Sequence, residues 1–124
     1  MAKKSFRELI VWQRAMDLVV EVYSLTKLLP KDEVYGLSSQ MRRAAVSVPS
    51  NIAEGNSRNT TKEYVRFLNI ALGSNAEVET QLEICLKLKY VEANQIYKAS
   101  ELCTEVGKML NSIAKKLTPS PKKE

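Results

Sequence analysis

Apolar side chains recur along this chain at alternating steps of three and four residues, which is the spacing of one face of an α-helix. Four stretches carry this pattern and predict four helices. The first covers about residues 5–29, the second begins between residues 34 and 38 and ends at 55, and the others cover about 60–90 and 93–117. Helices of this length with short links predict an all-α fold, an antiparallel up-down-up-down four-helix bundle. We place the bundle at residues 1–118 and interpret residues 119–124 as a disordered basic tail.

Local signals place the ends of these helices. The pairs Ser5–Glu8 and Thr60–Glu63 have the spacing of a capping box, so they predict the starts of the first and third helices. Pro30 ends the first helix, because proline cannot continue the hydrogen-bond ladder. Gly55 is typical of a C-terminal cap and predicts the end of the second helix.

Three residues break the regular pattern inside the helices. Pro49 lies within the second helix, where a proline crowds the carbonyl of Ala45, so we predict a kink there. Asn75 interrupts the apolar line of the third helix, and we interpret it as a buried amide that fixes register or oligomeric state. Gly73 lies in the middle of the same helix, and we interpret it as a point of close backbone approach.

The first helix carries two adjacent apolar stripes. The inner stripe is Val11, Ala15, Leu18, Val22, Leu25 and Leu29, and the second is Leu9, Trp12, Met16, Val19 and Tyr23. Two stripes indicate either wide burial within one chain or burial of a second side against another subunit. On the second interpretation, the oligomer interface consists of Trp12, Met16, Val19 and Tyr23.

The charge balance raises a nucleic-acid partner as a possibility. The chain has 19 basic and 14 acidic residues, a formal net charge of +5. Such a surplus comes either from solubilising tails and solvated faces or from a binding patch. The candidate phosphate-binding residues are Arg42, Arg43, Arg58, Lys62 and Arg66. Alternatively, Arg42 or Arg43 pairs with a carboxylate of Glu54, Glu77 or Glu79 on a neighbouring helix or subunit, and we favour that structural role for at least one of them.

Catalysis is not expected. The chain has no histidine, no Gly-rich phosphate loop and no nucleophile elbow, and we predict neither a metal site nor a cofactor. Cys85 and Cys103 both fall on apolar stripes and predict buried, reduced thiols. No apolar run reaches membrane-spanning length, and the N-terminus lacks the apolar core of a signal peptide, so we expect a cytoplasmic protein.

Three segments resemble a known family. The stretch Gln40-Met-Arg-Arg-Ala-Ala-Val-Ser-Val-Pro-Ser-Asn-Ile-Ala-Glu-Gly55 resembles the signature of the bacterial four-helix bundle proteins. These are also called the S23 ribosomal-protein-like family or 23S rRNA intervening-sequence proteins. The segments Phe6-Arg-Glu-Leu-Ile-Val-Trp-Gln13 and Phe67-Leu-Asn-Ile-Ala-Leu-Gly-Ser74, with Glu77-Val-Glu-Thr-Gln-Leu82 after it, agree in order and spacing.

The resemblance implies a ring-like homo-oligomer, commonly a pentamer. It also links the chain to the accessory variability proteins of diversity-generating retroelements, which are basic pentamers that bind nucleic acid and associate with a reverse transcriptase. Our leading hypothesis is therefore a non-catalytic oligomeric bundle that binds RNA or DNA through backbone phosphates. The alternative is a protein-interaction scaffold or accessory subunit, for example to a reverse transcriptase, that does not itself bind nucleic acid.

Overall fold

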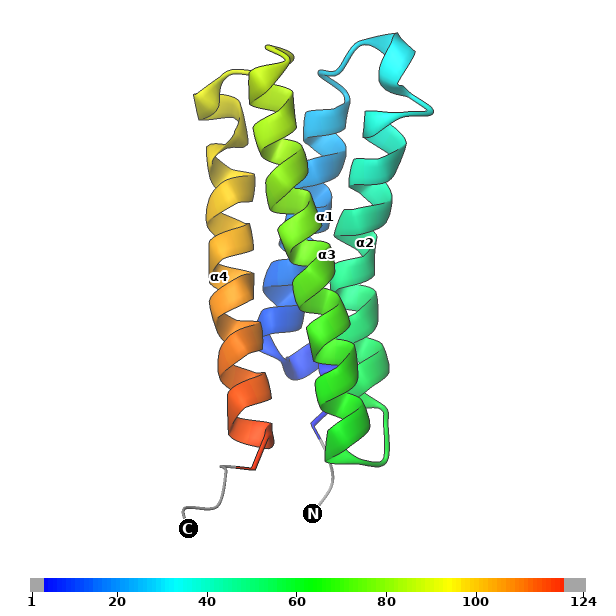
Figure 1. Cartoon of the computed structure of the whole chain (residues 1–124), viewed down its shortest axis with the longest axis vertical. Helices are drawn as coiled ribbons and strands as arrows, with labels where there is room; N and C mark the ends of the chain where they lie inside the picture. The colour runs from blue at the N-terminus through cyan, green and yellow to red at the C-terminus, as the bar shows by residue number, and fades with distance from the viewer. Residues whose placement is uncertain (1–3, 120–124) are drawn as a thin grey trace.

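The computed structural model describes residues 4–119 as four antiparallel helices in one bundle (Figure 1). Helix α1 packs against α2 and α4, and α3 packs against the same two helices, so that α1 and α3 are diagonal. The predicted up-down-up-down bundle is confirmed. The helices are α1 (Ile10–Thr26), α2 (Leu37–Asn56), α3 (Thr61–Lys87) and α4 (Ala93–Leu117), with short 3₁₀ helices η1 (Phe6–Glu8) and η2 (Lys31–Glu33) before α1 and α2.

The start of the first helix differs from the prediction. The Ser5 hydroxyl accepts from the backbone N–H of Arg7 and caps the 3₁₀ turn η1, after which Leu9 is extended and α1 begins. A capping box with Glu8 at the start of one long helix is therefore wrong. At its other end α1 stops at Thr26, and a tight turn over residues 27–29 buries Leu29 before Pro30.

The third helix begins as predicted but ends earlier. The Thr60 hydroxyl accepts from the backbone N–H of Glu63 at 3.2 Å, whereas the Glu63 carboxylate pairs with Arg66, so that only half of the capping box forms. The helix ends at Lys87 because Lys89 adopts a left-handed conformation, with φ of 63°. The N–H of Tyr90 then bonds to the carbonyl of Cys85, the 6→1 bond of a Schellman motif. Lysine at the position usually held by glycine hides this stop in the sequence.

Two glycines play roles other than those predicted. A Cβ on Gly73 would meet open space, so the predicted close approach there is wrong. Gly55 lies within α2 without a positive φ, so it is not a left-handed cap. A Cβ on Gly55 would lie 2.8 Å from the Cβ of Phe67 and 3.2 Å from the carbonyl oxygen of Tyr64. Close approach of α2 and α3 thus requires glycine at this position, while α2 itself runs unbroken through the buried Pro49.

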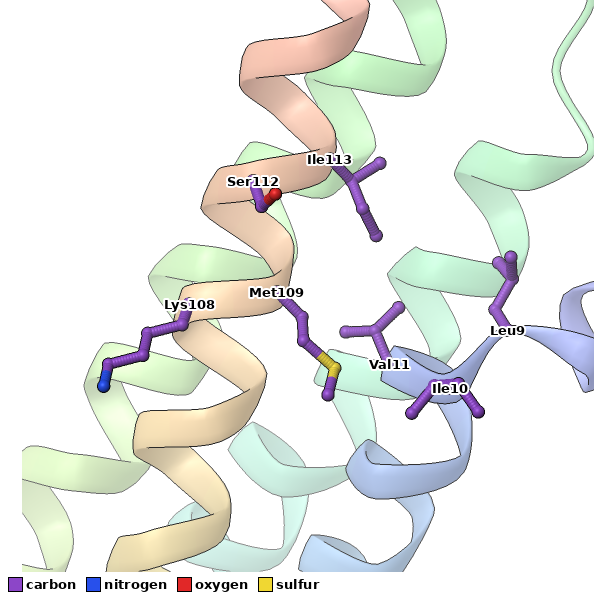
Figure 2. Close-up of a pocket in the computed structure, with 7 residues that line it drawn as sticks. All are labelled: Leu9, Ile10, Val11, Lys108, Met109, Ser112 and Ile113. Atoms are coloured by element: carbon purple, nitrogen blue, oxygen red, sulfur yellow. The ribbon is translucent and has the colours of Figure 1, made fainter.

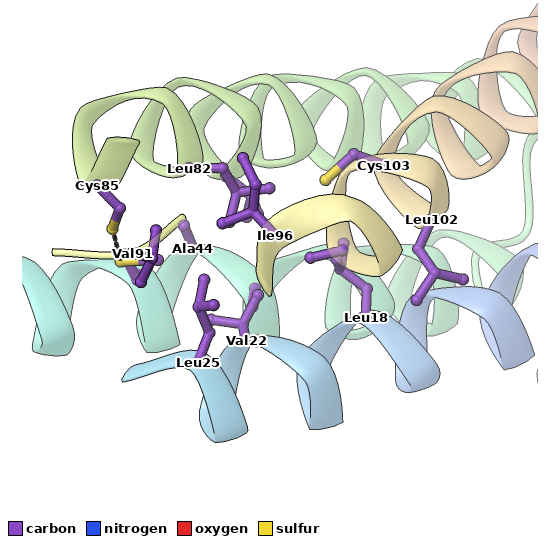
Figure 3. Close-up of a cluster of buried hydrophobic side chains, with 14 of the residues drawn as sticks. Leu18, Val22, Leu25, Ala44, Leu82, Cys85, Val91, Ile96, Leu102 and Cys103 are labelled. Atoms are coloured by element: carbon purple, nitrogen blue, oxygen red, sulfur yellow. Dashed lines mark hydrogen bonds between the residues drawn. The ribbon is translucent and has the colours of Figure 1, made fainter. Parts of the chain in front are cut away.

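The core consists of two apolar clusters stacked along the bundle. The first includes Leu18, Val22, Met41, Leu82 and Cys103 and lies toward the α1–α2 connection (Figure 3). The second surrounds the opposite end; its fully buried side chains are Val11, Ala15, Val48, Ile52, Leu68, Ala71, Val106 and Leu110. Burial of these stripes supplies the main driving force for folding.

Polar side chains lie between the two clusters. Asn75 is 2% exposed, and its side-chain N–H donates to the carbonyl of Cys103 on α4 at 2.9 Å. Its Oδ1 has no hydrogen-bond partner in the described part of the chain. The hydroxyls of Ser47 and Ser74 bond across α2 and α3 at 2.7 Å nearby. The prediction of a buried amide at Asn75 is confirmed.

Candidate anion-binding sites

The five predicted basic residues lie at two opposite ends of the bundle. Arg42 and Arg43 are near the start of α2, and Arg58 follows its last turn (Figure 1). A separation of sixteen residues along a helix corresponds to about 24 Å. One protomer therefore does not gather these five residues into one patch.

At the α2–α3 end, two arginines surround one aromatic ring. The guanidinium carbons of Arg58 and Arg66 lie 4.8 and 4.7 Å from the ring centroid of Phe67. Each arginine also pairs with a carboxylate at 3.2 Å, Arg58 with Glu54 and Arg66 with Glu63. The local charge is therefore balanced, which weakens this cluster as a phosphate site.

Lys62 lies one turn before Arg66 on α3 but lines a different surface feature. Lys62 lines a hollow between the start of α3 and the end of α4, with Val65, Leu117 and Pro119. Arg58 and Arg66 contact the Phe67 ring instead, and the phosphate-binding role of all three residues stays a prediction.

A hollow of about 450 Å³ at the α1–α2 end brings four cationic residues together. We call it the cationic pocket. It is lined by Thr26, Lys27, Leu29, Lys31, Val34, Tyr35, Ser38, Ser39, Arg42 and Arg43. None of these lining residues is acidic. The sequence analysis missed Lys27 and Lys31 because they lie in a connection, and only the fold brings them opposite Arg42 and Arg43.

Contacts with α1 hold the Arg42 side chain in place. Its Nε donates to the Thr26 hydroxyl at 2.9 Å, and its guanidinium carbon lies 4.5 Å from the ring centroid of Tyr23. The Thr26 hydroxyl, which is 5% exposed as part of its residue, in turn donates to the carbonyl of Tyr23. The guanidinium is thus oriented before any ligand arrives, which lowers the entropic cost of binding.

The alternative role predicted for these arginines is an ion pair with Glu54, Glu77 or Glu79. No such pair forms between the helices of one chain within residues 4–119, and pairing across a subunit contact stays a prediction. Arg42 instead contacts Thr26 and Tyr23. Arg43 lies between two hollows, because it also lines a polar groove between α2 and α3 with Glu77. The groove is lined as well by Ser47 and Ser74.

The start of α2 adds hydrogen-bond donors to the cationic pocket. Glu33 accepts from the N–H of Leu37 at 3.1 Å and from the hydroxyl of Tyr90 at 2.7 Å, and these two bonds, that of Tyr90 first, lower the pKa of Glu33. Ser38 and Ser39, in the first turn of α2, line the cationic pocket. Ser38 is 7% exposed. A helix N-terminus favours anions, since its first N–H groups carry partial positive charge.

The predicted interface residues lie along the surface of α1. Met16 and Tyr23 are 40% and 38% exposed, and Trp12 and Val19 are partly buried against the core clusters. The Trp12 ring also contacts Phe6 edge-on at a centroid distance of 5.2 Å. The second stripe of α1 is therefore half-exposed in a single chain, and its role as an interface stays a prediction.

A further hollow, of about 330 Å³, lies between the start of α1 and the C-terminal half of α4 (Figure 2). Met109 points across it from α4 toward Ile10 and Val11, whereas Lys108 points away. Its lining is almost entirely apolar, so it offers an anion little.

No helix within residues 4–119 is both long enough and apolar enough to span a bilayer. The described residues also contain no group of three or more Cys, Asp or Glu side chains placed to hold a metal ion. The fold defines a small four-helix-bundle protein with a hollow lined by four cationic residues at one end.

Comparison with known proteins identifies the family. Residues 7–112 match the family described as 23S rRNA-intervening sequence protein, and the chain belongs to it. A crystal structure of a protein of unknown function, from the S23 ribosomal protein family of Bacteroides thetaiotaomicron VPI-5482, has the same fold, with a TM-score of 0.79. The two chains are 28% identical over 86% of this chain and 99% of the other. A search of curated proteins found no match.

Proposed function

We propose that this chain is a non-catalytic cytoplasmic bundle that self-associates and binds RNA or DNA through backbone phosphates. The observation that carries the proposal is the cationic pocket, in which Lys27, Lys31, Arg42 and Arg43 meet without an acidic lining residue. Phosphates are the commonest partners of such a surface, and arginine matches them bidentately. The family description names an intervening sequence of 23S rRNA, so RNA is the first nucleic acid to test.

Self-association strengthens this electrostatic argument. The exposed stripe of α1 offers an apolar surface to a second copy, and the family resemblance favours a pentamer. Five copies would carry a formal charge of about +25. A ring would also repeat the cationic pocket along one side, so that contacts too weak in one protomer add up on a single strand.

The thiols do not support covalent chemistry. Burial, with a smaller contribution from Glu79, raises the pKa of the Cys103 thiol to about 12. Burial, together with Glu33, also raises the pKa of Cys85. A nucleophilic cysteine needs the opposite shift.

The second candidate function is a scaffold or an accessory subunit to an enzyme such as a reverse transcriptase. The observation that favours it is the same α1 stripe, because its apolar surface accepts a protein partner as readily as a second copy. Capture from host extract with nuclease treatment separates the two functions. A protein partner that survives the nuclease, with no binding of purified RNA or DNA, supports the scaffold.

Charge reversal at the pocket tests the leading proposal. In Lys27→Glu/Lys31→Glu, two pocket lysines are reversed, and in the control Lys115→Glu/Lys116→Glu, two exposed lysines at the far end of α4 undergo the same change in net charge. We expect the pocket variant to flatten the slope of log affinity against log salt by about two, since each lysine on a phosphate contributes about one. Equal effects of the two variants, or no binding by the wild type at low salt, would overturn the proposal.

A further inference from the structure

Tyr35 lies beside the cationic pocket with its side chain almost entirely in solvent. It is 97% exposed and lies in the turn between η2 and α2. Tyr35 is also one of the residues that line the hollow, together with Lys27, Lys31 and Arg42. Exposure of this extent means that the ring contributes almost no burial to the fold of one chain.

The other four tyrosines of the chain all have partners. The Tyr23 ring is covered by Arg42, and Tyr64 packs under Gly55. The hydroxyls of Tyr90 and Tyr97 donate to Glu33 and Glu101. Among the tyrosines within residues 4–119, only Tyr35 has no hydrogen-bond, ring or ion partner. Both faces of its ring are therefore free.

The turn that carries Tyr35 is hydrogen-bonded on both sides. The N–H of Val34 bonds to the carbonyl of Lys31 at 3.1 Å, and that of Gly36 to the carbonyl of Glu33 at 3.0 Å. The Glu33 carboxylate also lies close to the Gly36 Cα, because a Cβ there would be 2.9 Å from its Oε1. The ring is therefore presented from an ordered backbone, and little backbone freedom is lost when a ligand stacks on it.

Phosphate donors and a free aromatic face within one hollow fit one class of ligand, a nucleotide whose base is not already stacked. A duplex encloses its base faces within the helix, whereas a single strand exposes them, and aromatic side chains bind any base in this way. We infer that the cationic pocket binds single-stranded RNA or DNA, with a phosphate among Lys31, Arg42 and the Ser38 hydroxyl and a base stacked on Tyr35. This inference rests on the proposed function, since it requires the pocket to bind phosphate.

Oligonucleotides that differ in their bases but carry the same number of phosphates test this inference. The probes are labelled strands of about twelve nucleotides, a typical site length: oligo(dT), oligo(U), an abasic strand with the same number of phosphates, and a duplex of the same length. Anisotropy titrations at one salt concentration use the full-length chain. We expect the wild type to bind oligo(dT) or oligo(U) about fivefold or more tightly than the abasic strand, which is the gain from one stacked base. The ratio of oligo(U) to oligo(dT) then separates RNA from DNA.

Three variants complete the test. Tyr35→Ala is expected to bring oligo(dT) down to the affinity of the abasic strand without changing the salt slope, because it removes no charge. Tyr35→Phe keeps the ring and should keep the preference. Tyr97→Ala is the matched control, since Tyr97 is also largely exposed, at 64%, but lies on α4 away from the pocket residues.

The outcomes distinguish this inference from the function on which it rests. Equal affinity of the wild type for oligo(dT), the abasic strand and the duplex would overturn the inference and leave phosphate binding intact. Binding of no probe at low salt would overturn both. A change in the solution mass of Tyr35→Ala together with its loss of affinity would assign Tyr35 to a subunit contact and would also overturn the inference.

Discussion

The hydroxyl of Tyr90 donates a 2.7 Å hydrogen bond to the carboxylate of Glu33, which joins the α3–α4 connection to the α1–α2 connection at one end of the bundle. Glu33 also accepts from the first N–H of α2. These two bonds fix the helix start beside the cationic pocket, although neither connection contains a regular helix longer than one turn.

Removal of this bond should give a pH-dependent loss of stability. The bonds hold the pKa of Glu33 below its usual 4.5, so the folded state favours the carboxylate. The stabilisation is then present above about pH 4.5 and is lost as the pH falls through the lowered folded-state value. Tyr90→Phe should lower the midpoint of urea unfolding at pH 7. Below pH 4 the difference in midpoint between the variant and the wild type should become smaller. A difference in midpoint that grows as the pH falls would contradict the stabilising role of the Tyr90–Glu33 hydrogen bond.

A pair of glycine substitutions tests the close contact of α2 with α3. Gly55→Ala places a methyl group against the Phe67 Cβ and the Tyr64 backbone, so we expect a loss of about 1–3 kcal/mol in the free energy of unfolding. Gly73→Ala meets open space within α3 and should add about 0.5–1 kcal/mol. Chemical denaturation of both variants provides the measurement, and a destabilised Gly73→Ala would disprove the assignment.

The contact between Asn75 and Gly107 predicts a coupling between α3 and α4. A Cβ on Gly107 would lie 3.3 Å from Nδ2 of Asn75, tighter than most real contacts. In the Asn75→Ala background, Gly107→Ala should gain about 0.5–1 kcal/mol from helix propensity. In the wild type the gain should be smaller or reversed. A double-mutant cycle measures the difference, and strict additivity of the two substitutions would mean that the side chains do not touch.

The α1 stripe can be tested for self-association with little risk to the fold. Met16 is 40% exposed in the single chain, so Met16→Arg should leave the helix content unchanged. If the stripe is the interface, a buried charge should shift the solution mass toward the 14.0 kDa of one chain. Ile84→Arg, at 38% exposure on the diagonal helix α3, is the matched control. If the solution mass of Met16→Arg equals that of the wild type, the subunit interface does not include this stripe of α1.

The fold could be predicted in most respects because apolar periodicity alone determines which helical faces are buried. Helix α4 begins and ends at the predicted residues, 93 and 117. The errors lie at the ends of α1 and α3. Leu9 is extended just before α1 and Lys89 is left-handed just after α3, and neither is a residue type that usually marks a helix boundary.

The candidate site was less predictable. Arg42 and Arg43 were identified from charge alone, whereas Lys27 and Lys31 become neighbours of these arginines only when the turn after α1 folds back. The ion pairs of Arg58 and Arg66 were also missed, although both lie at i, i+3 or i, i+4 spacing and could have been anticipated. Nothing in the sequence pattern distinguishes the exposed ring of Tyr35 from the four tyrosines with partners. The predicted basic tail at 119–124 falls, after Pro119, outside the described residues.

Asn75, Ser47 and Ser74 form a polar layer that divides the core of the bundle into two halves, one above the other along the bundle axis. Apolar side chains on either side of it cooperate mainly with their own cluster, so each half is an approximate unit of local opening. Amide hydrogen exchange should therefore divide at this level, with the half that carries both termini opening without exposing the other. We expect the half that carries the cationic pocket to exchange more slowly, so that the charged side chains keep their positions while the opposite end opens.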